Sequence, residues 1–229
     1  MAINLKAYQE VLSQLSLYQA KLVAVSKTKP VSDITALYAA GQRIFGENYV
    51  QELTEKQAVL PADIEWHFIG HLQSNKVKYI APFVHTIHAV DSLKLLQEIN
   101  KQAAKCQRVI HCLLQVHIAA EETKFGMDEQ ELQQLLQTYA ANPAALSHVR
   151  ISGMMGMATN TTNETQIHKE FHQLHQLFGS VKSTYFNHET YFKELSIGMS
   201  ADYPIALQEG STMVRIGSLL FGERNYSQK

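Results

Sequence analysis

Cysteine and net charge are both scarce in this sequence. Of its 229 residues only Cys106 and Cys112 are cysteines, and they do not form a C-x-x-C pair. A disulfide framework is not indicated, so we expect a reducing, cytoplasmic location. The formal net charge is -1, which argues against a basic surface for nucleic acid or for an anionic membrane.

Long apolar runs are missing as well. The N-terminal segment MAINLKAYQEVLSQLSLYQAKL lacks the basic start and apolar centre of a signal peptide. No stretch approaches the roughly 18 consecutive apolar residues of a membrane span. Secretion and membrane insertion are therefore not expected. With 45% hydrophobic and 18% charged residues, the chain has the composition of a globular protein that can bury a full core.

Short strand-like segments alternate with amphipathic helical segments along the chain. Apolar residues spaced by three and four predict a helix over residues 4–19, and similar patterns occupy 93–104 and 129–140. Eight strands are predicted, at residues 22–25, 43–45, 64–69, 84–89, 109–118, 149–152, 191–196 and 213–216.

This alternation predicts the α/β class with a parallel sheet. Eight strand–helix units favour a TIM-type (β/α)8 barrel, formed as a single domain over residues 1–229. An open, doubly wound sheet is the alternative. It is disfavoured because no G-x-G-x-x-G motif follows the first strand.

The carboxyl ends of barrel strands are where binding and catalytic groups gather. The first predicted strand is followed by Ser26-Lys27-Thr28-Lys29-Pro30, so two lysines stand at this end. A lysine partly removed from water has a lowered pKa and can attack an aldehyde. Position alone does not separate Lys27 from Lys29, nor either of them from a solvated loop lysine.

The ends of the last two strands suit a phosphate group. Gly198, Ser200, Gly217 and Ser218 offer hydroxyls and approachable backbone N–H groups, and loops at this place commonly bind phosphate in the barrel fold. Arg215 is predicted to point inward from the last strand. A lysine beside a phosphate site indicates pyridoxal 5'-phosphate (PLP), which carries both an aldehyde and a phosphate.

Two further groups of residues have less specific interpretations. His168, His172 and His175 share one stripe of a predicted helix, a spacing that can hold a metal. Without an added carboxylate or thiolate, a surface stripe is the preferred interpretation, and no metal site is predicted. Met154 is a candidate for packing on a cofactor ring, although methionine near a barrel core is usually a space-filling residue.

Six segments occur in an order that resembles a known family: AVSKTKP (24–30), FGENYVQE (45–52), WHFIGHLQSNKVK (66–78), GMMGMAT (153–159), LSIGMSADY (195–203) and GSTMVRIGSLLFGER (210–224). Together they resemble the pyridoxal phosphate homeostasis proteins, which are single-domain relatives of the alanine racemase barrel (PLP fold type III). The resemblance extends from about residue 22 to residue 224.

This resemblance implies roles for individual residues. PLP would be held as a Schiff base on the first lysine of the S-K-T-K-P segment, which selects Lys27 over Lys29. Further cofactor-binding roles fall on Asn48 and His71 at the mouth, Ser200, Gly217 and Ser218 at the phosphate, and Arg215 at the pyridine nitrogen. Lys124 corresponds to a mobile lysine associated with cofactor release, although Phe125 follows it where serine is common in the family.

The implied function is cofactor homeostasis rather than strong catalysis. An arginine beside the ring nitrogen keeps that nitrogen unprotonated and weakens the ring as an electron sink. Racemases of this fold also use a tyrosine from a second domain of a partner subunit, and this sequence stops soon after the eighth strand. We therefore expect a monomer that stores, carries or regulates PLP, with PLP-dependent apo-enzymes as candidate recipients.

Two other functions remain open at this point. The first is a PLP-dependent enzyme such as an amino-acid racemase, with His71 or Tyr203 as the second base. The second is a pure interaction protein, which neither a run of like charges nor a heptad pattern supports.

Overall fold

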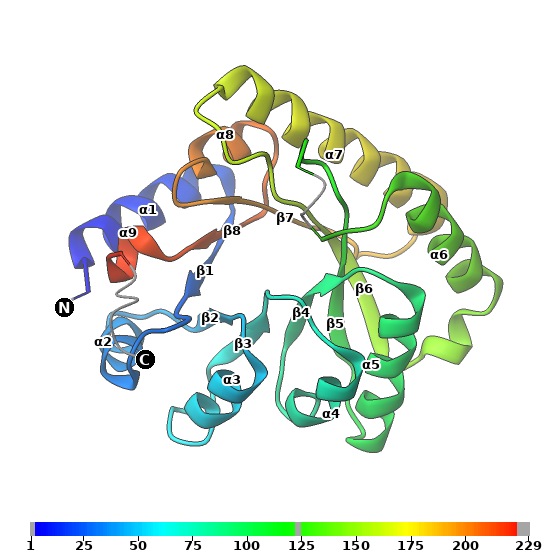
Figure 1. Ribbon diagram of the computed structural model, residues 1–229, viewed down its shortest axis with the longest axis horizontal. Helices are drawn as coiled ribbons and strands as arrows, with labels where there is room; N and C mark the ends of the chain where they lie inside the picture. The colour runs from blue at the N-terminus through cyan, green and yellow to red at the C-terminus, as the bar shows by residue number, and fades with distance from the viewer. Residues whose placement is uncertain (1–2, 122–124, 224–229) are drawn as a thin grey trace.

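Eight short apolar segments of the sequence become the strands of one closed barrel, seen as the central ring in Figure 1. In this computed structural model, which describes residues 3–121 and 125–223, every strand pairs in parallel with the next one, and β8 pairs with β1. The strands are β1 (Lys21–Val25), β2 (Ile44–Glu47), β3 (Glu65–Phe68), β4 (Thr86–Val90), β5 (Ile110–Gln115), β6 (Val149–Met155), β7 (Glu194–Met199) and β8 (Met213–Ile216). The predicted TIM-type barrel is confirmed.

Helices follow the strands and lie around the outside of the barrel (Figure 1). They are α1 (Leu5–Tyr18), α2 (Val31–Ala39), α3 (Val50–Gln57), α4 (Val77–Ile80), α5 (Leu93–Lys105), α6 (Glu129–Ala141), α7 (Glu164–Tyr185), α8 (Tyr203–Gln208) and α9 (Ser218–Phe221). Short 3-10 turns occupy Ser74–Lys76 and Pro143–Leu146. None of the helices in the described part of the chain is both long and apolar enough to cross a membrane.

Side-chain caps set the starts of several helices. Asp128 and Glu131 form a reciprocal capping box at the start of α6, and the Ser92 hydroxyl accepts the Leu95 N–H at the start of α5. Such caps satisfy backbone donors that have no partner within the helix. They fix the residue at which each of these helices begins.

Most predicted strands differ from the observed ones at their ends, and two of these differences have a clear physical reason. The strand predicted at 191–196 starts only at Glu194, because Phe192 instead stacks on Phe186 and Phe178, at ring-centroid distances of 4.3 and 5.0 Å. β6 continues past Ser152 through Gly153. A Cβ at Gly153 would lie 1.8 Å from the Glu194 carbonyl oxygen, so only glycine allows this approach of β6 to β7.

The interior of the barrel is polar at its centre, unlike the usual filling of branched apolar residues. His67, His88, Ser196 and Arg215 are all buried there. The His88 Nδ1 lies 3.1 Å from the Ser196 hydroxyl, although β4 and β7 are not neighbours in the sheet. This contact therefore spans the inside of the barrel.

Candidate functional site

The backbone around Lys27 is held on both sides. Lys27 is half-buried just beyond the carboxyl end of β1. The Lys56 amine donates to the Ser26 carbonyl oxygen at 2.7 Å, and the Thr28 N–H donates to the Glu52 carboxylate at 2.6 Å. Thr28 has a φ of 63°, a left-handed conformation that costs energy for a residue other than glycine. Contacts from α3 thus maintain a strained backbone directly after Lys27.

A buried ionic network supports this segment from the helix side. Lys56 lies 2.7 Å from carboxylate oxygens of both Glu47 and Glu52, and the Ser26 hydroxyl donates to Glu47 at 2.6 Å. Burial raises the pKa of the Glu47 carboxyl to about 7, against the opposing effect of the Lys56 charge. Sequence reasoning missed these residues. The available signal was the spacing of four between Glu52 and Lys56 on a helix.

Lys29 has a different role from Lys27. Its amine donates to the carbonyl oxygens of Phe221, Gly222 and Glu223, at 2.7, 3.0 and 3.0 Å. These carbonyls belong to the last residue of α9 and to the two residues after it, where a cation is favourable. Lys29 therefore fastens the end of the described chain to the segment that follows β1.

The loops after β7 and β8 meet at the same end of the barrel as Lys27. The Gly217 N–H donates to the Ser200 hydroxyl at 3.3 Å, and Ser218 follows exposed at the start of α9. Gly198 has a φ of 93°, and a Cβ there would lie 2.6 Å from the Ala206 side chain. Glycine is thus required for the tight loop that presents Ser200. The arrangement places two hydroxyls and backbone N–H groups where the sequence predicted a phosphate site.

Arg215 points into the barrel, as predicted. Its guanidinium donates to the Ser196 hydroxyl and carbonyl at 2.6 and 2.7 Å, and to the Gly156 carbonyl at 3.0 Å. Burial lowers the pKa of Arg215 to about 10, so it remains a cation at neutral pH. Three oxygen acceptors hold this charge in place inside the barrel.

Asn48 and His71 follow the ends of β2 and β3. The Asn48 Oδ1 is buried and has no hydrogen-bond partner within residues 3–121 and 125–223, so it is an acceptor available to a ligand. His71 is exposed, stacks on Phe125 at a centroid distance of 4.4 Å, and has its Nδ1 3.3 Å from Asp91. Both residues thus lie at the end of the barrel where the sequence placed them.

The structure does not place the remaining candidates from the sequence at the barrel mouth. Met154 is fully buried in the apolar core, and its register partners Leu114 and Leu195 belong to the same core, so the structure does not bring it to the mouth. The Tyr203 hydroxyl donates to Gln14 on α1 at 2.7 Å, which directs it to the outside of the barrel. Lys124 lies outside the described residues.

The histidine stripe on α7 acquires a carboxylate that the sequence did not pair with it. His168 Nδ1 and His172 Nδ1 lie 2.8 and 3.0 Å from the two carboxylate oxygens of Glu209, beyond the end of α8. His175 Nδ1 lies 2.6 Å from the Glu209 carbonyl oxygen. The stripe therefore joins α7 to the segment after α8.

Replacing Glu209 with glutamine is expected to give a small, pH-dependent loss of stability. The hydrogen bonds from His168 and then His172 hold the pKa of Glu209 below its ordinary value. A lowered carboxyl pKa stabilises the fold above the unfolded value of about 4.3, and this contribution is lost as pH falls through the folded pKa. Urea unfolding at pH 7 should show a loss of about 0.2–1 kcal/mol, which shrinks in acid. Equal stability of the two proteins at pH 7 would contradict this contact.

Comparison with known proteins places the chain in a family. The model of the alanine racemase N-terminal domain matches residues 1–225. The pyridoxal phosphate homeostasis protein of Haemophilus influenzae is 40% identical over 210 residues, which cover 90% of this chain and 86% of that protein. The corresponding Escherichia coli K12 protein is 39% identical over 212 residues, covering 91% and 87%.

Solved structures agree with these sequence matches. PipY of Synechococcus elongatus without PLP aligns with a TM-score of 0.87 at 35% identity, and PipY with PLP bound aligns with a TM-score of 0.84 at 34% identity. Each alignment covers 95% of this chain and 99% of PipY. The shared length, identity and barrel show that the chain belongs to the family of pyridoxal phosphate homeostasis proteins, within the larger group of alanine racemase N-terminal domains.

Proposed function

We propose that this protein binds pyridoxal 5'-phosphate at the carboxyl end of its barrel, attached to Lys27 as a Schiff base, and serves in intracellular homeostasis of the cofactor. The observation that carries the proposal is the convergence of the Lys27 segment with the Ser200–Gly217 contact at one end of the barrel. The names of the relatives and the PLP-bound PipY support the choice of ligand.

The residues present fit the chemical groups of PLP. When bound, PLP supplies an aldehyde that reacts with an amine and a ring that can accept electrons. Lys27 provides the amine, while Ser200, Gly217 and Ser218 provide donors for the phosphate. The unsatisfied Asn48 oxygen provides an acceptor at the mouth. These residues therefore offer partners to both the aldehyde and the phosphate of PLP.

The charge of Arg215 favours storage of the cofactor over catalysis with it. Its pKa of about 10 leaves it protonated at neutral pH, so it would donate to the pyridine nitrogen and keep that nitrogen without a proton. An unprotonated ring is a weak electron sink. We propose that the protein acts as a cytoplasmic monomer that stores PLP or passes it to PLP-dependent apo-enzymes.

A racemase-like enzyme is the alternative function. It needs a second base opposite Lys27, and the Tyr203 hydroxyl is directed to Gln14 instead. His71 is the remaining candidate, because its exposed ring lies at the barrel mouth. Turnover of an amino acid by the PLP-loaded protein, lost in His71→Ala, would support this alternative against the homeostatic one.

The test of PLP attachment is reduction of the loaded protein. PLP-fed protein should be yellow, and borohydride should fix the label on the peptide that contains Lys27. A colourless protein, or label spread over exposed lysines such as Lys78, would exclude the proposal.

Replacing Ser200 with alanine is expected to weaken binding of PLP by roughly 10- to 150-fold, because a hydrogen bond to a charged group contributes about 1.5–3 kcal/mol. The Ser200 hydroxyl accepts the Gly217 N–H in the proposed phosphate loop and takes no part in the reaction with the aldehyde. Binding of pyridoxal, which lacks the phosphate, should therefore change little. Titration of both compounds separates the two effects, and an equal loss for both would argue against a phosphate role.

A further inference from the structure

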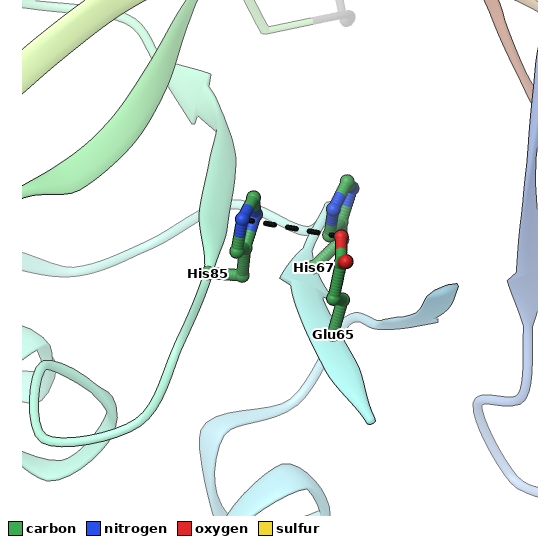
Figure 2. A group of neighbouring side chains, drawn as sticks. All are labelled: Glu65, His67 and His85. Atoms are coloured by element: carbon green, nitrogen blue, oxygen red, sulfur yellow. Dashed lines mark ion pairs between the residues drawn. The ribbon is translucent and has the colours of Figure 1, made fainter. Parts of the chain in front are cut away.

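A second cluster of ligand-type side chains lies at the opposite end of the barrel. Glu65 is the first residue of β3, and His85 directly precedes β4, so both stand at the amino ends of parallel strands. Figure 2 shows these two side chains together with His67. One ligand atom from each of the three residues lies within 4.8 Å of the others, and His85 Nε2 is 3.9 Å from Glu65 Oε2.

His67 supplies an independent indication of a ligand. Its side chain is 2% exposed, and its Nδ1 lies 2.9 Å from His88 Nε2. Its Nε2 is buried and lacks a hydrogen-bond partner in the described part of the chain. A buried polar atom without a partner is costly and calls for an explanation, such as a bound ion. Since Nδ1 is occupied, Nε2 is the nitrogen that His67 can offer.

We propose that Glu65, His67 and His85 bind one divalent transition-metal ion, with Zn²⁺ as the best match. Two imidazoles and one carboxylate form a zinc ligand set that leaves a fourth position for water. The buried His67 Nε2 has no hydrogen-bond partner among the described residues, and the side chains of His85 and Glu65 are half-exposed beside it.

The hydrogen bond to His88 completes the arrangement around His67. A metal on Nε2 requires His67 to carry its proton on Nδ1, from which it donates to His88 Nε2. The His88 Nδ1 then donates to the Ser196 hydroxyl, 3.1 Å away. Metal-bound histidines are usually oriented by such a partner on the other ring nitrogen. The buried pair His67–His88 therefore has the form of a metal ligand with its supporting group.

Binding requires a movement of His85. The rings of His67 and His85 are parallel within 4°, with centroids 5.6 Å apart, and one ion cannot lie in both ring planes. Tetrahedral zinc with bonds of about 2 Å also needs ligand atoms roughly 3.3 Å apart. The side chains of His85 and Glu65 are 43% and 48% exposed, so both have room to move. Tilting His85 gives up its stacking on His67 and on His111, whereas His67 itself stays in place.

The charged side chains around this site have opposite effects on the binding of a cation. Lys21 and Arg108 disfavour a further cation near His85, whereas Glu65 and Glu194 favour it. The Lys21 amine is paired with Glu194 at 2.5 Å, which reduces its field at the histidines. Glu65 then provides the negative charge next to the ion.

The test is titration of the full-length, chelator-treated protein with ZnCl₂ by calorimetry. We expect one Zn²⁺ per chain. Glu65→Gln and His85→Ala should each weaken binding at least about tenfold, since loss of even a supporting partner of a ligand typically costs that much. Both residues are half-exposed, so these variants should fold. Co²⁺ should give the visible absorption of a tetrahedral ion in the original protein and lose it in both variants.

Two controls make the outcome decisive. The double variant His168→Ala/His172→Ala removes the other histidine pair near a carboxylate and should bind Zn²⁺ normally. Lys27→Ala should also bind normally, because Lys27 lies at the far end of the barrel. Absence of stoichiometric binding, or binding that survives in Glu65→Gln and His85→Ala, would overturn the proposal.

Discussion

Replacing Lys27 with alanine is expected to abolish the borohydride-fixed label and to lower PLP affinity on the order of 100-fold, or about 2.7 kcal/mol. The variant loses the amine that reacts with the aldehyde, while the donors at Ser200 and Gly217 remain in place. Residual binding should therefore be reversible, without the absorption band of the Schiff base, and still competed by inorganic phosphate. Absorbance titration and peptide mapping measure these effects.

Lys29→Met is the matched control for this experiment. Its amine is bound to the carbonyl oxygens of residues 221–223, so its loss should lower the melting temperature and leave the label on Lys27. The two lysines are two residues apart in one segment, yet only Lys27 should take the label. A label that moves to Lys29, or that persists in Lys27→Ala, would contradict the assignment.

The barrel could be predicted from sequence because it depends on local periodicity. Each strand carries a short apolar segment, and the order of strands in a (β/α)8 barrel follows the chain. The predicted strand at 213–216 coincides with β8, and that at 22–25 misses only the first residue of β1. The strand predicted at 191–196 was misplaced because Phe192 is apolar in a loop that packs on Phe186. Periodicity alone does not distinguish an aromatic residue in a strand from one that packs in a loop.

The candidate site could be predicted only in part, because long-range contacts decide the rest. Strand-end logic located Lys27, Ser200 and Gly217 at one end of the barrel. The contact that distinguishes Lys29 comes from carbonyls more than 190 residues away, which no local pattern contains. The side of the sheet on which Met154 lies depends on a register irregularity between β5 and β6, and a shift of one residue reverses the faces of a strand.

Replacing Lys56 with methionine is expected to lower the free energy of unfolding by about 3–5 kcal/mol at pH 8, because it removes one partner of a buried ion pair. Glu47 is fully buried and bonded to Lys56 at 2.7 Å. Burial already raises the pKa of Glu47 to about 7, and loss of the opposing Lys56 charge raises it further. A raised carboxyl pKa means that stability is lost as pH rises towards the folded value, so the deficit should be smaller at pH 5 than at pH 8.

The exposed pair Lys6–Glu10 provides the control for the Lys56 experiment. It has the same spacing of four as Glu52–Lys56, but its side chains are 88% and 63% exposed and 3.9 Å apart. Lys6→Met should therefore cost roughly 0.5 kcal/mol or less. Adding Glu47→Gln to Lys56→Met should recover much of the stability at pH 8, since no charge is then left buried. A deficit that neither varies with pH nor responds to Glu47→Gln would mean that Lys56 stabilises the fold by packing alone.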